Sequence, residues 1–588
     1  MTAGSGGTNI SADKAANATS PQWTTLGNIV LTETVKSGFS AGGTLILTAP
    51  SGWQFNSPGS VTTTVTGGSG GQNVAVTGVS VASGTMTLTL TVNGTNKTDI
   101  LTIIGVQVRS TSGASLPASG NILRTAANPG SATIGGITND GTNFGSLSQI
   151  VGAANKLAVS VQPSATATAG VAFATQPAIA IQDQFSNTRS AANGVADNAT
   201  VVTAARSAGT GTLQGTLTAT ASDGTATFLN LSHTVATTIS IGFTATGLTS
   251  TTSSAIVVSP ATAAKVVFVQ HPTTTTAGLS ISPAITVQVQ DAYSNNVPQS
   301  VSVVMTISTG TGTLGGTTPT TTDGTGLATF NDLSITTSGT KNLTASSGGL
   351  TSAVSNAFDI NPSSATQLAF VQQPTSAQAG ATISPSPTVQ LKDQFGNSVL
   401  TSGVSVSVAL TTGTGTLSGT ASQLTDASGL ATFTNLSVDV EGSKQLTATS
   451  SGLTSAVSSS FSIAPASASI LAIVQQPTTT NAGAPISPSV TVQLKDAFGN
   501  NVTTSGVSIT MSLTSGSGTL AGTTSRITNA SGLATFDDLS INLSGSKTLT
   551  ASSAGLTSAA TNSYTVQPLG ASKLAFLQQP LAAAANDT

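Results

Sequence analysis

The sequence contains no cysteine and few charged residues, and both absences narrow the range of possible functions. Only 6% of its 588 residues are Asp, Glu, Lys or Arg, against about 25% in ordinary soluble domains. Without cysteine the chain forms neither disulfides nor thiolate metal sites. The net charge is −3 and Lys and Arg form no block, so the clustered cations of a nucleic-acid binder are missing.

Long apolar runs are also missing, yet the chain is not of the disordered type. No run approaches the roughly 20 apolar residues of a membrane helix, so we expect no membrane insertion. Disordered segments combine high charge with few apolar residues, whereas 38% of this chain is hydrophobic. Abundant Thr and Val favour pleated, half-buried surfaces, and the 62 glycines supply turns. The composition predicts a folded, all-β protein.

A repeat of just over one hundred residues organises most of the chain. The string Val371–Pro374 recurs at Val474–Pro477 and, with one change, at Leu577–Pro580, and looser copies end at Pro163 and Pro272. The five prolines are separated by 109, 102, 103 and 103 residues. Two further markers keep the same phase. One is an aspartate, at Asp183, Asp291, Asp393 and Asp496, and the other is a phenylalanine, at Phe228, Phe330, Phe433 and Phe536. Three markers in one phase identify a tandem array.

Hydrophobic residues alternate with polar ones inside each repeat. In the fourth copy Val490, Val492 and Leu494 alternate with polar residues, and the same period continues from Val507 to Leu513. This period of two places one strand face on a core and the other in water. About seven short strands in roughly 100 residues is typical of a β-sandwich.

The motifs of the repeat are most complete in its fourth copy, at Val492–Asn500, Gly518–Leu520 and Thr528–Phe536. These motifs resemble those of bacterial immunoglobulin-like (Ig-like) domains of the invasin and intimin type, and the resemblance covers residues from about 155 to 570. It implies Ig-like sandwiches of the kind that serve in adhesins, surface-layer proteins, enzyme spacers and phage particles. The first repeat departs most, because its turn Ser222–Thr225 is shortened and Ser186 replaces the turn glycine.

These markers predict the domain organisation of the chain. We expect a different N-terminal β-sandwich (1–154), four Ig-like repeats (155–262, 263–364, 365–467 and 468–570) and the first strand of an incomplete repeat (571–588). A proline follows the last apolar strand of each repeat, at Pro260, Pro362, Pro465 and Pro568. Proline fixes one torsion and cannot donate a hydrogen bond, so we expect stiff joints and an elongated rod.

The phased aspartates Asp183, Asp291, Asp393 and Asp496 allow two interpretations. Each precedes a Gly-Asn or Ser-Asn turn, where a carboxylate can accept hydrogen bonds from nearby backbone amides. Calcium ligation is the alternative, but a hard cation takes six to eight oxygens, usually from several carboxylates. Because each repeat has few acids at this point, we predict structural turns, no metal and no cofactor.

Residues suited to catalysis are scarce. The two histidines, His233 and His271, have no counterparts in other repeats, and we expect solvated loop residues rather than a catalytic or metal role. Intramolecular Lys–Asn bonds would need a lysine in every repeat, but Lys392 and Lys495 are matched by glutamines. We therefore predict no enzyme and no catalytic residue.

Two features leave room for binding or assembly. Trp23 and Trp53 both lie in the N-terminal domain, where an aromatic platform could bind sugar, although burial in a core is the commoner fate. Leu574 and Phe576 share one face of the C-terminal strand, followed by Leu577. That strand is either part of an interrupted array or a donor that completes a sheet in the next copy, which would give a head-to-tail filament.

Three functions remain open on this sequence. The first is an extracellular structural component of the cell surface, as a stalk or a filament subunit that binds copies of itself. The second is an adhesin whose N-terminal domain binds a glycan or a protein. The third is a phage particle protein, because residues 1–7 show neither the basic region nor the apolar stretch of a secretory signal.

Overall fold

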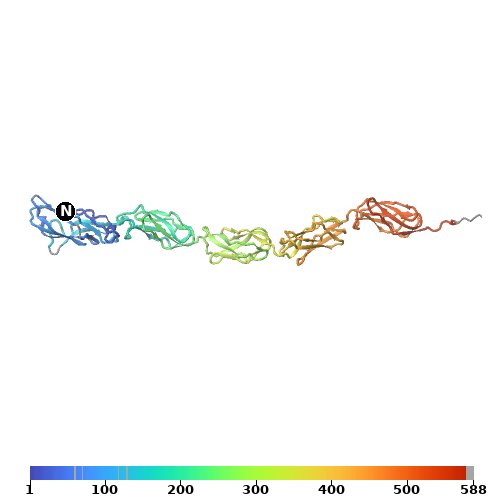
Figure 1. Ribbon diagram of the computed structural model, residues 1–588, viewed down its shortest axis with the longest axis horizontal. Helices are drawn as coiled ribbons and strands as arrows, with labels where there is room; N and C mark the ends of the chain where they lie inside the picture. The colour runs from blue at the N-terminus through green and yellow to red at the C-terminus, as the bar shows by residue number, and fades with distance from the viewer. Residues whose placement is uncertain (58–60, 69, 117, 127–129, 576, 578–588) are drawn as a thin grey trace, which may run out of the picture.

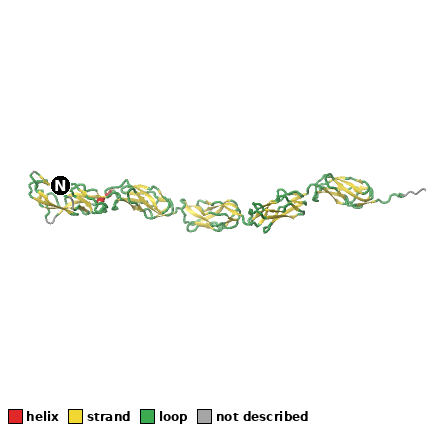
Figure 2. Cartoon of the chain, viewed as in Figure 1, coloured by secondary structure: helices red, strands yellow, loops and turns green. Residues whose placement is uncertain are grey.

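A computed structural model describes residues 1–57, 61–68, 70–116, 118–126, 130–575 and 577. Five compact bodies follow one another in a single row from the N-terminus to the C-terminal segment (Figure 1). Strands make up each body, and the described residues contain only two short 3-10 helices, η1 (Ala12–Lys14) and η2 (Ala191–Asn193) (Figure 2). The predicted elongated all-β fold is confirmed. Across these described segments, no helix has the length and apolar character needed to span a membrane.

The N-terminal domain has its own strand order, distinct from that of the repeats. Its largest sheet runs β1-β14-β12-β5-β9-β8, and smaller sheets run β3-β10-β7, β2-β11-β6 and β13-β4. The bounds are β1 Ile10–Ser11, β2 Thr24–Thr25, β3 Ile29–Thr32, β4 Phe39–Ala41, β5 Gly43–Thr48, β6 Trp53–Phe55, β7 Thr62–Gly67, β8 Val74–Val81, β9 Thr85–Val92, β10 Asp99–Ile104, β11 Gln107–Ser110, β12 Ser119–Thr125, β13 Thr133–Ile134 and β14 Asn143–Ile150.

All four repeats share one plan of eleven strands, here given for the third. A three-stranded sheet runs β37-β39-β43, a larger sheet runs β38-β47-β45-β40-β42 with β46 beside β45, and β41 pairs with β44. The bounds are β37 Gln367–Gln372, β38 Ala377–Gln378, β39 Thr388–Lys392, β40 Ser405–Thr412, β41 Leu417–Ser418, β42 Ser422–Leu424, β43 Leu430–Thr432, β44 Ser437–Val438, β45 Gly442–Thr449, β46 Ala456–Val457 and β47 Phe461–Ala464. The equivalent strands are β15 to β25 in repeat 1, β26 to β36 in repeat 2 and β48 to β58 in repeat 4.

The alternation seen in the sequence decides which side chains enter each core. In β40, Val406 and Val408 are buried while their serine neighbours are exposed. Val408 pairs with Ala448 of β45, which is also buried. Four separate clusters result, one for each repeat, and the phased phenylalanines lie in them at Phe228, Phe330, Phe433 and Phe536.

Each described repeat already contains its own first strand. These strands are β15 (Lys156–Val161), β26 (Ala263–Gln270), β37 and β48 (Ile470–Gln475). Each pairs antiparallel with the second long strand of the same repeat, which is β17 (Ala178–Gln182), β28 (Ile285–Asp291), β39 or β50 (Val490–Lys495). The turn that follows this second strand is where successive domains meet.

Candidate functional site

The joint between repeats 2 and 3 is built around Asp393, whose side chain is fully buried. One carboxylate oxygen, Oδ1, accepts from the backbone N–H groups of Phe395 (2.9 Å) and Asn397 (2.8 Å). The other, Oδ2, accepts from the Asn397 side-chain amide (2.8 Å) and from the N–H of Ser363 (3.0 Å), which lies in the linker. One carboxylate thus fixes both the turn and the linker that enters the domain.

Asn397 carries the contact across to the preceding domain. Its Nδ2 donates to the carbonyl oxygen of Thr336 at 2.7 Å, and its Oδ1 accepts from the N–H of Ser338 at 2.8 Å. Both partners belong to a loop of repeat 2. We call Asp393 and Asn397 the Asp–Asn clamp, because together they tie linker, turn and preceding domain into one hydrogen-bonded unit.

An aromatic ring completes the contact. Phe395, between the two clamp residues, lies over Gly278 of repeat 2, and a Cβ atom at Gly278 would come within 2.4 Å of the ring. The backbone of Gly278 has φ +81°, a conformation that costs other residues roughly 1–2 kcal/mol. Glycine is therefore required here both for its backbone shape and for the close approach of the ring.

The same arrangement recurs at the neighbouring joints. We number the joints from the N-terminus, so joint 3 is the one just described. At joint 2 the asparagine donates to a carbonyl oxygen and accepts from an N–H of the preceding domain, both at 2.7 Å. At joint 4 the two corresponding distances are 2.8 and 2.9 Å. The clamp, ring and glycine are Asp291, Asn295, Tyr293 and Gly170 at joint 2, and Asp496, Asn500, Phe498 and Gly380 at joint 4.

The clamp carboxylates are held in the charged form. Burial opposes their ionisation, but hydrogen bonds from the asparagine side chain and the backbone amides outweigh it and keep the pKa values of Asp291, Asp393 and Asp496 below the ordinary value. The four hydrogen-bond donors to each of these carboxylates are groups of the protein itself. In the part of the chain that the structure describes, no group of three or more His, Asp or Glu side chains is placed to hold a metal ion.

A buried lysine supports the loop that receives the clamp. Lys341 donates from Nζ to the carbonyl oxygen of Ser338 at 2.9 Å, and the N–H of that same residue donates to Asn397. Lys444 does the same for Glu441 at 3.0 Å, and Lys547 for Ser544 at 3.1 Å. Sequence reasoning missed these lysines, although their spacing of 103 residues was a usable signal.

Repeat 1 supports its loop with a histidine instead. His233 stands where repeat 2 has Ile335, and its Nδ1 lies 3.1 Å from the N–H and 2.9 Å from the carbonyl oxygen of Val235. The expectation of a solvated His233 is wrong: the residue is fully buried because its strand position faces the core. His271 is only partly buried; it stacks on Phe268 at 5.2 Å and accepts from the N–H of Asn356 at 3.0 Å.

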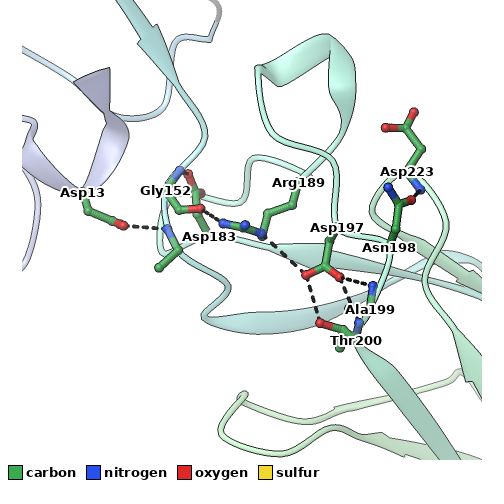
Figure 3. A network of polar contacts seen from close by, with 10 residues as sticks. Asp13, Gly152, Asp183, Arg189, Asp197, Asn198, Ala199, Thr200 and Asp223 are labelled. Atoms are coloured by element: carbon green, nitrogen blue, oxygen red, sulfur yellow. Dashed lines mark hydrogen bonds and ion pairs between the residues drawn. The ribbon is translucent and has the colours of Figure 1, made fainter. Parts of the chain in front are cut away.

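Joint 1, between the N-terminal domain and repeat 1, has the clamp of Asp183 and Asn187. Asp183 accepts from the linker N–H of Gly152 at 3.0 Å, and Asn187 donates to the carbonyl oxygen of Gly113 at 2.7 Å. Phe185 lies over Gly113, as the other rings lie over their glycines. Figure 3 shows a polar network beside this clamp, which includes Asp13, Arg189 and Asp197.

That network brings further groups to joint 1. Asp13, in η1, accepts from the N–H of Ala153 at 2.6 Å and from the Gln184 side chain at 2.9 Å. Arg189, which replaces a buried valine of the other repeats, donates to the carbonyl oxygen of Gly152 and forms an ion pair with Asp197 at 3.6 Å. The first joint therefore has reserve contacts beyond the clamp.

The remaining predicted site residues lie elsewhere. Trp53 is 4% exposed in the core of the N-terminal domain, so it offers no aromatic platform; the alternation of β6 turns it inward with Phe55. Trp23 is half-buried, and the Arg109 guanidinium lies 3.9 Å from the centre of its ring. Leu574 and Leu577 are fully exposed, and Phe576 lies outside the described residues.

Comparison with protein-family models gives no match, and comparison with curated protein sequences gives none either. Among solved structures, the Escherichia coli adhesin FdeC is 19% identical, with 52% of this chain and 98% of that chain covered and a TM-score of 0.26. Invasin, a bacterial integrin-binding protein, is 16% identical over 70% of this chain and 79% of its own, with a TM-score of 0.25. Yersinia pseudotuberculosis InvD is 18% identical over 51% and 96%, also with a TM-score of 0.25.

Bacterial Ig-like adhesin domains are thus among the structures that this chain resembles, as the repeat motifs predict. The TM-scores of 0.25 and 0.26 are low, so these likenesses by themselves indicate no function.

Proposed function

We propose that the protein is a non-catalytic extracellular stalk whose repeats hold the N-terminal domain at a fixed distance from its point of attachment at a cell surface. The observation that carries this proposal is the Asp–Asn clamp, which recurs with nearly constant geometry at joints 2, 3 and 4. A chain of domains on loose linkers would need no such hydrogen bonds across each joint. A clamp that fixes each domain on the last converts a string of sandwiches into a stiff spacer.

Three properties support this mechanical role. The clamp groups are buried and mutually satisfied, so solvent does not compete for them. No ion pair crosses joints 2 to 4 among the residues described, so salt has little to screen there. The linkers are short and begin with a proline, which removes backbone freedom at the same place.

The test is the height of the N-terminal domain above a surface. The full chain is attached through its C-terminus to a supported layer, and neutron reflectometry locates the N-terminal domain at low coverage, where neighbours do not touch. A stiff stalk keeps that domain near its full extension. A variant with Asn295, Asn397 and Asn500 all changed to Ala should bring it closer to the surface. Equal heights for both chains would refute the proposed stalk.

An adhesive role for the N-terminal domain is a second candidate, favoured by a cavity of about 440 Å³ in that domain. Leu31, Phe39 and Ile134 give it an apolar wall, and Glu33 lies on its lining. A glycan or protein bound here would be displayed at the end of the stalk. Binding of the full chain to glycan arrays, compared with a Val35→Trp variant at the exposed rim, tests this role directly.

The filament alternative rests on residues 571–588. Exposed Leu574 and Leu577 supply apolar side chains for a sheet in another copy. Electron microscopy of the full chain beside a version that ends at Gly570 tests it: regular filaments only with the longer chain support donor-strand exchange, and single rods in both samples oppose it.

A further inference from the structure

The end of repeat 4 carries the same receiving surface as the preceding repeats. Gly483 occupies the place of Gly380. Its N–H donates to the carbonyl oxygen of Ile541 at 2.8 Å, and the N–H of Gly380 donates to the carbonyl oxygen of Val438 at 2.9 Å in the same way. The buried Lys547 supports the carbonyl oxygen of Ser544 as Lys444 supports that of Glu441. The loop is thus already braced in the form that receives a clamp asparagine.

This receiving surface is exposed in repeat 4. Among the residues that the structure describes, a Cβ atom at Gly483 would meet none within 4 Å, whereas at Gly380 it would meet the Phe498 ring at 2.1 Å. Asn542 and Ser544 correspond to Asp439 and Glu441, which bind Asn500 at joint 4. Between them Leu543 is 49% exposed. Gly483, Asn542 and Ser544 are all exposed residues. The glycine that would lie under a ring (the glycine seat), the Asn542 carbonyl oxygen and the Ser544 N–H are therefore available together for a partner.

We propose that this end of repeat 4 is a docking surface for one further Ig-like domain, joined through the linker that starts at Pro568. The domain is recognised by a turn of the form Asp, any residue, Phe or Tyr, Gly or Ser, Asn. Its ring lies on Gly483, and its asparagine donates to the Asn542 carbonyl oxygen and accepts from the Ser544 N–H. Its aspartate accepts from the N–H of Leu569, which stands where Ala466 donates to Asp496 at 2.9 Å.

A second copy of this chain does not fit the surface as well. All four turns of the required form, at Asp183, Asp291, Asp393 and Asp496, are already docked on the domain before them. The linker N–H also belongs to the site, and a linker places the next domain beside the surface at high effective concentration. These two facts favour a domain that follows in the same chain over one that arrives from solution.

The test extends the full chain by a domain already known to fold within it. Residues 571–588 are replaced by a second copy of residues 468–570, and amide hydrogen exchange is followed at Ser544. In the original chain this N–H should exchange about tenfold or more faster than those of Ser338 and Glu441, which donate across joints. In the extended chain it should slow to their rate, and a Gly483→Leu change in the original repeat should restore fast exchange.

Three results would overturn the proposal. One is an unchanged Ser544 exchange rate in an extended chain whose added core amides are protected. Another is slowing of Ser544 with protein concentration in the original chain, since the occupant would then be a second copy. The third needs no added domain: Gly380→Leu in the original chain should make the Glu441 N–H exchange as fast as that of Ser544, and failure to do so contradicts the role of the glycine seat.

Discussion

Joint 1 and joints 2 to 4 use the same turn on two different kinds of neighbour. In joints 2 to 4 an Ig-like repeat follows another, and the clamp, one ring and one glycine make the contact. In joint 1 the neighbour is a sandwich of another strand order, and Asp13 and Arg189 add hydrogen bonds around the linker. The clamp, the ring and the glycine occur at both kinds of joint, and they are therefore the minimum contact that a joint requires. The hydrogen bonds of Asp13 and Arg189 adapt joint 1 to the different surface of the N-terminal domain.

The receiving loops show the same contrast. Lys341, Lys444 and Lys547 brace the loop from one strand position in repeats 2 to 4. Repeat 1 has Ile239 at that position and braces its loop with His233 instead. The lysines donate to the carbonyl oxygens of Ser338, Glu441 and Ser544, whereas His233 contacts the backbone of Val235, one residue before the equivalent Ala236. Different side chains thus brace the same loop through different backbone groups, which indicates that the loop geometry, rather than a particular residue, is what the next domain requires.

The largest effect should come from removing a clamp carboxylate at a joint where the described residues add no hydrogen bonds beyond the clamp. Asp393→Ala leaves four donors without their acceptor, and we expect a loss of about 3 kcal/mol from repeat 3 together with a bent joint. Asp183→Ala should cost similar stability but keep joint 1 aligned, because Asp13 and Arg189 remain. Since the chain lacks cysteine, pairs of introduced cysteines can carry spin labels that report the distance across each joint. If the distance distributions broadened equally at joints 1 and 3, the contacts of Asp13 and Arg189 would not hold joint 1 in line.

A glycine pair gives the next largest effect with a matched control. Gly380 and Gly483 have φ +73° and +80°, so a leucine strains the backbone similarly at both. In the described structure a ring lies above Gly380 and none above Gly483, and Gly380→Leu should cost about 2 kcal/mol more than Gly483→Leu by expelling Phe498. Thermal unfolding of the two variants measures the difference. Equal losses would show that the ring contributes nothing to joint 4.

Acid should weaken joints 2 to 4 through their clamps. The pKa values of Asp291, Asp393 and Asp496 are lower in the folded protein than in the unfolded chain. Their contribution to stability is therefore complete above the unfolded value, about 4, and is lost as the pH falls toward the folded value. We expect broader label distances at these joints below about pH 4. Rods as straight at pH 2.5 as at pH 7 would mean that the charged form is not needed.

The smallest effect concerns the core of repeat 4. Tyr564 pairs with Lys547 where repeats 2 and 3 have Phe358 and Phe461. Its hydroxyl is buried with no hydrogen-bond partner in the described structure, and burial raises the pKa of Tyr564 to about 12. Tyr564→Phe should leave repeat 4 equally stable or more stable by up to about 1 kcal/mol. A clear loss of stability in chemical denaturation would reveal a role for the hydroxyl.

The sequence predicted the fold better than it predicted the joints. The alternation at Val406 and Val408, together with the phased markers, was enough to predict tandem sandwiches. Both signals can be seen in the sequence because they consist of the type of side chain at regularly spaced positions. The clamp was only half visible: Asp393 was found by its phase, but its asparagine binds backbone groups of Thr336 and Ser338, which any residue provides. His233 was misjudged for a related reason, since a residue without counterparts gives no sign that it replaces a core position.

The most direct test of the clamp compares Asn397→Ala at joint 3 with Asn187→Ala at joint 1. Neither change alters the domain cores, and each removes the side chain that crosses its joint. Electron microscopy of the full-length rods gives the distribution of bend angles at each joint. We predict a wide distribution at joint 3 in the first variant and a narrow one at joint 1 in the second. Straight joints in both variants would contradict the account, because the asparagine would then not hold the rod together.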